Sequence, residues 1–246
     1  MNHLIFTAFG LILLILTVPC HAKWSLDLET GAAFTGLNTI QIPAEDGTRF
    51  SLTEDLSSDT TWTGRIRINW MMTERQTLSV LAAPLSVSGD GYADRDIRFE
   101  DTTFPAGTRL ESTYRFDSYR LTWRFNLVQT EATCLALGMS GKIRDAEIRI
   151  ESDTATETSK NTGFVPLLSF RFEWRPSDRL MLLIDGDALA GPQGRAEDVL
   201  TAMSIRFLPS LSGFLGYRVL EGGADNDTLY TFALIHYAVI GITYQF

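Results

Sequence analysis

Apolar and polar residues alternate every two positions along several stretches of this chain. Trp62, Ile66 and Trp70 fall on one side of such a stretch, and Arg65 and Arg67 fall on the other. Successive side chains of a β-strand point to opposite faces, so this pattern predicts a strand with one apolar and one polar face. The same alternation occupies 119–127, 164–174 and 199–207. After residue 23 no window keeps a 3.6-residue period, and an all-β fold is therefore predicted.

The pattern predicts ten strands, with eight or twelve as alternatives. They lie at about 24–35, 59–71, 76–88, 111–127, 133–150, 162–174, 179–189, 195–208, 212–221 and 229–246. The third is irregular, because Pro84 lies inside it and Leu81 and Leu85 compete with Val80 for the apolar face. A bulge or an edge irregularity is expected there.

The links between these strands alternate in length. Those after the second, fourth, sixth and eighth strands are tight, those after the first, third and fifth are long, and those after the seventh and ninth are intermediate. Short turns at one end and longer loops at the other are typical of an antiparallel up-and-down transmembrane β-barrel. An even strand number places both termini on the short-turn side. We expect one barrel domain over 23–246.

Alternation alone does not tell which face meets lipid, and a soluble lipocalin-like barrel would turn its apolar face inward. The apolar faces of the second, fourth, sixth and eighth strands carry no charge, as hydrocarbon contact requires. Aromatic residues gather beside the tight turns, as in an interfacial girdle, at Trp70, Trp123, Phe125, Phe172, Trp174 and Phe207. Small residues such as Ala136 and Gly138 on the polar faces suit the concave side of a narrow barrel. These features favour lipid outside.

The first 22 residues predict export. An apolar run from Leu4 to Val18 is followed by Cys20-His21-Ala22, with cleavage expected after Ala22. A retained anchor helix is the alternative, but the run is short for a span of roughly 20 residues. A lipid attached to Cys20 is disfavoured by Pro19. The expected mature chain is Lys23 to Phe246.

The last strand carries a further motif. Ile240, Ile242, Tyr244 and Phe246 share one face, and the sequence ends on the aromatic residue. This resembles the C-terminal signature of Gram-negative outer-membrane β-barrel proteins. The resemblance implies an outer-membrane location with both termini in the periplasm, contact with outer-membrane lipid and lipopolysaccharide, and recognition of Tyr244 and Phe246 by the barrel-assembly machinery. It implies no particular activity. His236 departs from the pattern because it shares the outward parity, so a bulge or a protected rim position is expected there.

Charge and cysteine content narrow the function. The formal charge of −9 disfavours nucleic acid as a partner, because nucleic-acid binding requires a basic face. Cys134 is the only cysteine expected in the mature chain, so no internal disulfide is possible. We therefore looked for function on the polar faces of the strands.

The predicted lumen is highly charged. Its side chains would form a candidate charge network of Asp27, Glu29, Arg65, Arg67, Arg120, Arg124, Lys142, Arg144, Arg171, Glu173, Asp185, Asp187, Asp198, Arg206 and Arg218. Buried charges must be paired, or desolvation costs several kcal/mol per ion. We expect this network to fill the lumen of a structural or interaction barrel. The alternative is a narrow pore that prefers anions, because the set holds nine basic and six acidic groups.

Two acidic features are candidate cation sites. If the link near Pro192 is a hairpin, Asp187 and Asp198 approach each other, and closely spaced carboxylates require an arginine, a shared proton or a cation. The loops Gly36–Ser58 and Gly89–Leu110 are acidic on balance and are expected to form a solvated surface. Divalent cations bridging these loops to lipopolysaccharide are an open alternative. No cofactor is predicted.

An envelope enzyme acting on lipid A or on peptide is the remaining alternative. His236 is the only histidine of the expected mature chain, and its surroundings match neither the Ser/His arrangement of lipid A deacylases nor the Asp–His pair of omptin proteases. Without a nucleophile and a base in one constellation, no catalytic residue is assigned.

Overall fold

The computed structural model describes residues 23–191 and 194–246. The predicted signal peptide, residues 1–22, lies outside these ranges. Within them the chain is all-β, as the alternation predicts. The described part contains no helix long and apolar enough to cross a membrane.

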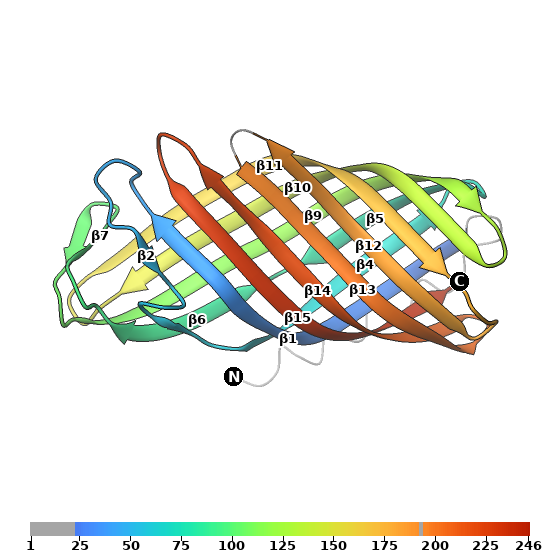
Figure 1. The fold of residues 1–246 in the computed structure, drawn as a ribbon, viewed down its shortest axis with the longest axis horizontal. Helices are drawn as coiled ribbons and strands as arrows, with labels where there is room; N and C mark the ends of the chain where they lie inside the picture. The colour runs from blue at the N-terminus through green and yellow to red at the C-terminus, as the bar shows by residue number, and fades with distance from the viewer. Residues whose placement is uncertain (1–22, 192–193) are drawn as a thin grey trace, which may run out of the picture.

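Ten long antiparallel strands form a closed barrel (Figure 1). They are β1 (Lys23–Gln41), β4 (Thr61–Met71), β5 (Gln76–Ala83) continued by β6 (Ser86–Tyr92), β9 (Arg109–Gln129), β10 (Thr133–Glu151), β11 (Thr156–Trp174), β12 (Leu180–Gly191), β13 (Gly194–Leu208), β14 (Leu211–Asp225) and β15 (Tyr230–Gln245). The barrel closes where β15 pairs with β1, from Ser25 opposite Gln245 to Gln41 opposite Tyr230. Closure removes the unpaired edges that a sheet in lipid cannot tolerate.

The third wall strand is interrupted at Pro84, as expected, but it contains no bulge. Ala83 lies opposite Ser118 and Ser86 opposite Arg115, so two residues separate the pairs on each strand and the register is kept. Pro84 has no N–H to donate. The Leu85 N–H donates to a side chain, the Asp117 carboxylate (3.2 Å), instead of to a backbone carbonyl.

In the third wall strand, Leu81 and Leu85 do not share the outer face with Val80, contrary to the expectation from the sequence. Leu81, Leu85 and Val87 are buried inside the barrel, whereas Val80 is 56% exposed on the outer face. The apolar residues therefore do not compete for one face, because Leu81, Leu85 and Val87 occupy inward positions and Val80 an outward one.

The prediction of a long link after the fifth wall strand is wrong. β10 ends at Glu151 and β11 begins at Thr156, and the two strands are paired over their whole length. The links after the seventh and ninth wall strands are also short, because β13 begins at Gly194 and β15 begins at Tyr230. Residues 156–161 at the start of β11 are polar on both faces and resemble a loop in sequence, but they belong to the hydrogen-bonded ladder with β10, which continues past the apolar belt.

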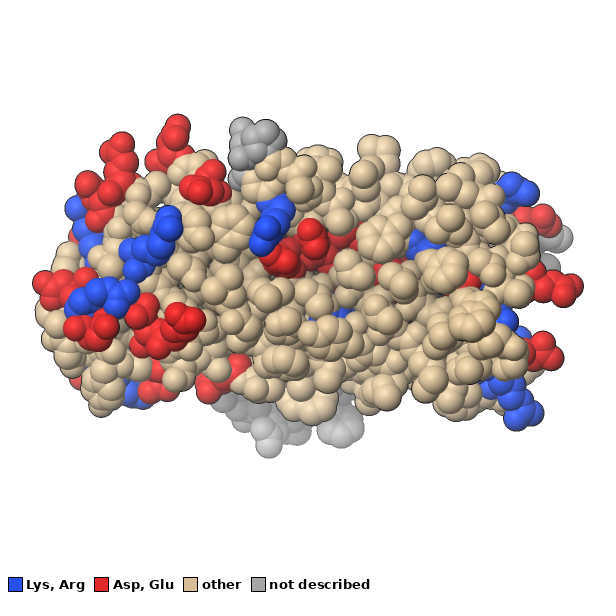
Figure 2. All heavy atoms as spheres, viewed as in Figure 1, with Lys and Arg blue, Asp and Glu red and all other residues tan. Residues whose placement is uncertain are grey.

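The outer surface of the barrel carries a wide uncharged belt. Figure 2 shows charged side chains gathered at both ends of the molecule and few between them. Large apolar side chains of the belt are exposed, including Met139 (63%), Phe164 (70%) and Leu168 (60%). At the end with the short turns, Trp24 stacks on Trp70 with ring centroids 5.7 Å apart. A soluble protein does not expose so much apolar surface, and the belt matches a lipid-facing barrel wall.

Replacing Met139 with lysine should lower the free energy of unfolding by about 2–4 kcal/mol, because it places a charge near the middle of the apolar belt. The measurement is equilibrium urea unfolding in phosphatidylcholine vesicles. Thr113→Lys is the matched control, since Thr113 is partly exposed on the outer face of β9 beyond the belt. Equal effects of the two substitutions would mean that the belt is not in lipid.

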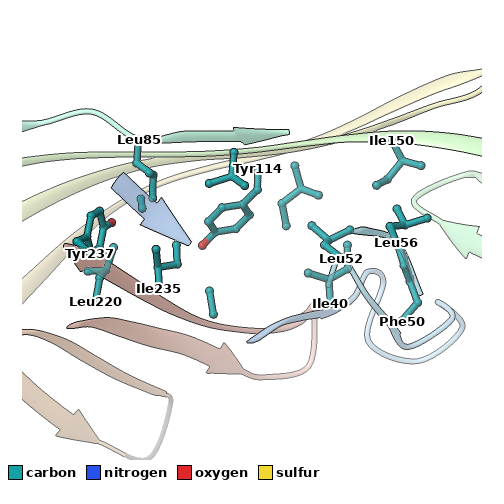
Figure 3. Packing of buried hydrophobic residues seen from close by; sticks show 14 of the residues in the cluster. Ile40, Phe50, Leu52, Leu56, Leu85, Tyr114, Ile150, Leu220, Ile235 and Tyr237 are labelled. Atoms are coloured by element: carbon teal, nitrogen blue, oxygen red, sulfur yellow. The ribbon is translucent and has the colours of Figure 1, made fainter. Parts of the chain in front are cut away.

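The end of the barrel opposite the short turns is closed by two loops. The segments 42–60 and 93–108 carry four short strands, β2 (Phe50–Ser51), β3 (Ser57–Ser58), β7 (Ile97–Phe99) and β8 (Thr102–Phe104). We call these two segments the cap. Their apolar side chains pack inside the barrel mouth, where Figure 3 shows Phe50, Leu52 and Leu56 turned toward Ile40 and Ile150.

The cap corrects the expectation of a purely solvated loop surface. Phe50, Phe99 and Phe104 are at most 2% exposed, and the rings of Phe50 and Phe99 meet edge to face at 6.4 Å. The acidic side chains remain at the outer surface of the cap, and the apolar ones form a core beneath them.

Candidate functional site

The lumen below the cap is filled by charged side chains from eight wall strands. Residues at alternate positions of β1, β4, β9, β11, β12, β13 and β14 point inward because the outward positions are taken by the apolar belt. Most of these side chains are buried, with Arg120, Arg218, Asp185, Asp187 and Asp198 each at most 3% exposed. Lys142 of β10 is also buried. Such burial requires partners, and the structure provides them for all but a few.

Asp185 of β12 accepts hydrogen bonds from three arginines. Arg124 binds both of its carboxylate oxygens at 2.8 and 3.2 Å, Arg67 donates at 3.0 Å and Arg171 at 2.8 Å. Arg171 also donates to Glu173 at 2.7 Å. The three arginines come from β4, β9 and β11, so Asp185 ties distant walls of the barrel together. We call this set the Asp185 triad.

Asp198 of β13 is the centre of a second triad, the Asp198 triad. It accepts hydrogen bonds from Arg65 (2.9 Å), Arg120 (2.5 Å) and Arg218 (2.6 Å). These arginines come from β4, β9 and β14. The Asp198 triad therefore also spans the lumen.

Further carboxylates complete both groups. Glu29 accepts two hydrogen bonds from Arg218, at 2.8 and 2.7 Å, and lies 3.7 Å from Arg65. Asp187 accepts one from Arg120 at 2.7 Å, so Asp187 and Asp198 share an arginine across the strands. Asp27 is bound by neutral groups, the Asn69 amide (2.8 Å) and the Thr243 hydroxyl (2.7 Å).

The sequence-predicted charge set is thus brought together in large part. Six arginines, Arg65, Arg67, Arg120, Arg124, Arg171 and Arg218, face six carboxylates, Asp27, Glu29, Glu173, Asp185, Asp187 and Asp198, so this core is formally neutral. Arg206 does not join it. That residue is exposed near the short-turn end and forms no ion pair within the described ranges.

Lys142 and Arg144 of β10 also stay outside both triads. They face the lumen between the Asp198 triad and the cap. Lys142 is 2% exposed and lies over the Phe116 ring at 4.6 Å. Arg144 contacts the Asn161 side chain, while its Nε is buried without a hydrogen-bond partner in the described part of the chain.

The spaces left within the triads are small. A cavity of about 50 Å³ lies among Asp27, Arg67, Asp185 and their neighbours, and another of about 10 Å³ lies beside Arg120 and Asp198. A single water needs roughly 10–15 Å³. These spaces are too small for hydrated ions to file past the arginines.

A larger cavity of about 430 Å³ lies above the Asp198 triad. Its polar side includes Lys142, Arg144 and Asn161. Its remaining lining is mostly apolar, with Tyr114, Phe116, Ile148, Val165, Leu189, Leu220 and Ile235 among the side chains. Sequence reasoning assigned Lys142 to the lumen but gave no sign of a cavity beside it.

Ion pairs hold the outer surface of the cap together. Arg95 joins Asp55 (3.0 Å) and Asp94 (2.5 Å), and Arg109 joins Asp90 (2.9 Å) and Glu111 (2.8 Å). Asp55 and Asp94 thus have an arginine partner in the cap, and Asp90 and Glu111 have one where β6 and β9 adjoin it. In the residues that the structure describes, no group of three or more His, Cys, Asp or Glu side chains is placed to hold a metal ion.

The Asp55 carboxylate links the two cap segments. Partial burial opposes its ionisation, but hydrogen bonds from Arg95 and from the Ser51 N–H (2.7 Å) outweigh this and lower its pKa. A lowered pKa means that the ionised form stabilises the folded cap. This contribution is fully present above the unfolded pKa of about 3.9 and is lost as the pH falls through the lower pKa of the folded cap.

Acidification should therefore loosen the cap before it affects the barrel wall. Amide hydrogen exchange across 51–56, corrected for the intrinsic rate, should lose protection as the pH falls from 5 to 2. Asp55→Asn should remove most of this pH dependence. Unchanged protection of 51–56 in the wild-type protein at pH 2 would rule out a stabilising role for the carboxylate.

A second cluster, which sequence reasoning missed, lies on the outside of the wall. Arg115 of β9 pairs with Asp117 (2.8 Å), Asp145 (2.8 Å) and Glu147 (3.2 Å), and Lys160 of β11 also reaches Glu147 (3.2 Å). These residues continue the outward parity of the belt strands. Their position just past Tyr119 marks the end of the apolar belt on this side.

His236 faces outward and away from the lumen carboxylates. Its ring stacks between Phe34 and Tyr217, with centroid distances of 5.4 and 5.9 Å, and its Nδ1 lies 2.5 Å from the Tyr217 hydroxyl. The bulge expected near this residue lies in the neighbouring strand, where the β1 register shifts between Thr35 and Leu37. The intervening Gly36 leaves room for the histidine ring, since a Cβ there would come within 2.7 Å of Nε2.

Comparisons with known proteins agree with the architecture. No protein-family model and no curated protein matches the sequence. Among solved structures, the outer membrane protease OmpT from Escherichia coli is similar with a TM-score of 0.57 and 8% identity, covering 91% of this chain and 97% of that one. The transport unit of the Escherichia coli autotransporter AIDA-I covers 98% of this chain and 96% of its own, at 10% identity and a TM-score of 0.47. Ail of Yersinia pestis, in complex with sucrose octasulfate, covers 92% of this chain and 100% of its own, at 9% identity and a TM-score of 0.41. The chain has the fold of Gram-negative outer-membrane β-barrel proteins.

Proposed function

We propose that this protein is a structural or interaction barrel of the Gram-negative outer membrane, with a lumen closed by paired charges. The observation that carries the proposal is the pair of arginine triads around Asp185 and Asp198. Both carboxylates are at most 2% exposed and each bonds three arginines from different strands. A conducting pore needs a continuous water path, and side chains occupy that space here.

The proposed orientation places the cap outside the cell and both termini in the periplasm. Lys23 lies opposite Met71 and the Phe246 N–H donates to the Trp24 carbonyl, so the start of β1 and the C-terminus lie with the short turns at one end of the barrel. The cap lies at the other end (Figure 1). Tyr244 and Phe246, whose rings meet edge to face at 4.9 Å, would present the signature read by the assembly machinery. The belt would contact lipid, and the Arg115 cluster beyond it would lie at the level of lipopolysaccharide.

The surface offered to partners is then the cap. It combines an apolar core with an outer layer of carboxylates and arginines, in which Arg95 pairs with Asp55 and Asp94, and Arg98 pairs with Asp46. A fixed, mixed-charge surface suits specific contact with an external partner better than passage of a solute. This is an interaction role at the cell surface.

The two alternatives receive less support from the geometry. An anion-preferring pore would need free cations along an open path, but the six arginines of the triads are bound to carboxylates. The OmpT structure is that of a protease, yet the only histidine of the expected mature chain, His236, lies on the outer face beside Tyr217. The carboxylates of Asp185 and Asp198 each accept hydrogen bonds from three arginines, an arrangement that does not suit a general acid or base.

Planar-bilayer recording of the purified protein tests the proposal. Insertion is verified separately by protection of the barrel from protease. We expect no steady conductance over a range of voltages at 1 M KCl. Stepwise, long-lived openings with anion selectivity would overturn the closed-lumen proposal and favour the narrow pore.

A further inference from the structure

The cavity above the Asp198 triad combines an apolar wall with a cationic floor. Its volume is about 430 Å³, within the range of roughly 300–1,000 Å³ that is usual for small-molecule sites. Ring and aliphatic side chains from β9, β10, β14 and β15 form the wall, including Tyr114, Ile148, Leu220 and Ile235. A site of this kind matches a ligand that has both a hydrocarbon part and a charged part.

The two cations of the floor lack counter-ions. Lys142 is 2% exposed and has neither a hydrogen bond nor an ion pair in the described ranges, and Arg144 has a buried Nε without a partner. Both line the cavity from adjacent inward positions of β10, so their Cα atoms are separated by about 7 Å. The nearby carboxylates pair with other arginines, because Asp198 bonds three of them, Asp187 bonds Arg120 through one oxygen, and Glu221 of the cavity lining pairs with Arg195. The second oxygen of Asp187 is buried without a hydrogen-bond partner in the described part of the chain, and it bonds neither Lys142 nor Arg144.

An unpaired buried cation costs several kcal/mol in desolvation. Elsewhere in this lumen every buried arginine of the triads has an acidic partner, so two uncompensated cations side by side stand out. A bound anion would supply the missing partner and would form charge-assisted hydrogen bonds with both side chains.

The wall beside the cavity is open between two strands. β11 and β12 pair only from Leu168 opposite Ala188 to Trp174 opposite Leu182. Beyond Leu168 the two strands separate, with Ser159 and Asn161 of β11 and Leu189 and Gly191 of β12 lining the cavity on either side. Figure 1 shows β10 and β11 continuing toward the cap end well past β12 and β13.

This opening begins within the lipid-facing belt. Leu168 and Phe164 point outward there and are 60% and 70% exposed. A hydrocarbon chain can therefore reach the cavity from the outer leaflet along these apolar side chains. Besides Lys142 and Arg144, the charged residues that line the cavity are Arg195 and Glu221, which pair with each other. The rim above the opening is polar, so an ionised head group can follow.

We propose that the cavity binds a single-chain amphiphile with an anionic head, a carboxylate or a phosphate, taken from the outer leaflet. The head pairs with Lys142 and Arg144, and the alkyl chain lies along Tyr114, Ile148 and Leu220. The site is a binding site and involves no covalent step. It lies outside the two triads, so it does not depend on whether the lumen conducts.

Fluorine NMR of dodecanoate with a terminal CF₃ group tests this site. The protein is placed in phosphatidylcholine nanodiscs, and empty nanodiscs give the signal of the partitioned probe. We expect a separate bound resonance that saturates at one probe per barrel. Dodecyl phosphate should displace it if the site accepts both heads, and failure to do so would restrict the site to carboxylates. Dodecanol and acetate should not displace it, because one lacks the charge and the other lacks the chain.

Three variants identify the residues. Lys142→Met and Arg144→Met should each weaken binding at least tenfold, while Lys160→Met, on the outer face of β11, should bind as the wild type does. Lys142→Met should be at least as stable as the wild type in urea, because the buried unpaired charge is gone, so weaker binding would not reflect misfolding. The proposal is overturned if no bound resonance appears, if dodecanol competes as well as unlabelled dodecanoate, or if Lys142→Met and Arg144→Met both bind normally.

Discussion

Replacing Asp198 with alanine is expected to destabilise the barrel by about 3–5 kcal/mol, the usual cost of removing one partner of a buried ion pair. Arg65, Arg120 and Arg218 would remain in the lumen, with only Glu29 and Asp187 to compensate three positive charges. Reversible urea unfolding in phosphatidylcholine vesicles measures the change.

Asp153→Ala is the matched control, since Asp153 is exposed in the link between β10 and β11. It should change stability by no more than about 0.5 kcal/mol. Adding Arg65→Met to Asp198→Ala should recover part of the loss, because Arg218 keeps Glu29 and Arg120 keeps Asp187, so the one uncompensated cation is removed. Equal stabilities of Asp198→Ala and Asp153→Ala would mean that the Asp198 triad does not hold the lumen together.

Replacing Phe99 with alanine is expected to detach the cap while leaving the wall intact. Phe99 is fully buried, and truncation of a buried phenylalanine costs about 3–5 kcal/mol. The cap segments pack on one another through Phe50 and Phe99, so both should become accessible to protease. Limited proteolysis with fragment mapping measures this.

The expected cuts lie within 42–60 and 93–108, with the strands of the wall protected. Tyr92→Ala serves as the control, because Tyr92 is 68% exposed at the end of β6 and lies outside the apolar cluster. Cleavage of the wall strands at the same rate as the cap would contradict an independently closing cap. Equal resistance of the Phe99 variant and the wild type would show that the cap is held by its ion pairs alone.

The barrel itself could be predicted because a period of two is a local signal. The alternation within one stretch, such as 119–127, is enough to identify the apolar face of that strand, whatever the rest of the chain does. The same alternation predicts which side chains face the lumen, including those of Arg120, Arg124 and Asp185. Parity is decided by neighbouring residues, so sequence alone can provide it.

The pairing inside the lumen could not be predicted. Arg65 bonds Asp198, which is 133 positions away and lies on a strand that is not a neighbour of β4. Which inward residues meet depends on barrel diameter, strand tilt and side-chain length together. The separation of Arg206 from the network has the same origin, because its height in the barrel depends on register.

The cap was missed for a different reason. Phe50, Phe99 and Phe104 lie among acidic residues in irregular segments, where no period marks a buried face. The one available signal was the alternation of Ile97 and Phe99 around Arg98. The lateral opening was equally hidden, because it depends on β11 outlasting its partner β12 by about a dozen residues.

The central claim is that the lumen arginines are bound and shielded from water. In this structure the Nε–H groups of Arg120, Arg124 and Arg218 donate to Ser118, Ser169 and Glu29, at 3.1, 2.8 and 2.8 Å. Their signals can be followed by NMR in a ¹⁵N-arginine-labelled sample in nanodiscs. Hydrogen exchange of these three signals should be at least a hundredfold slower than that of the exposed Arg75. Exchange as fast as that of Arg75 would mean a water-filled lumen and would contradict the account.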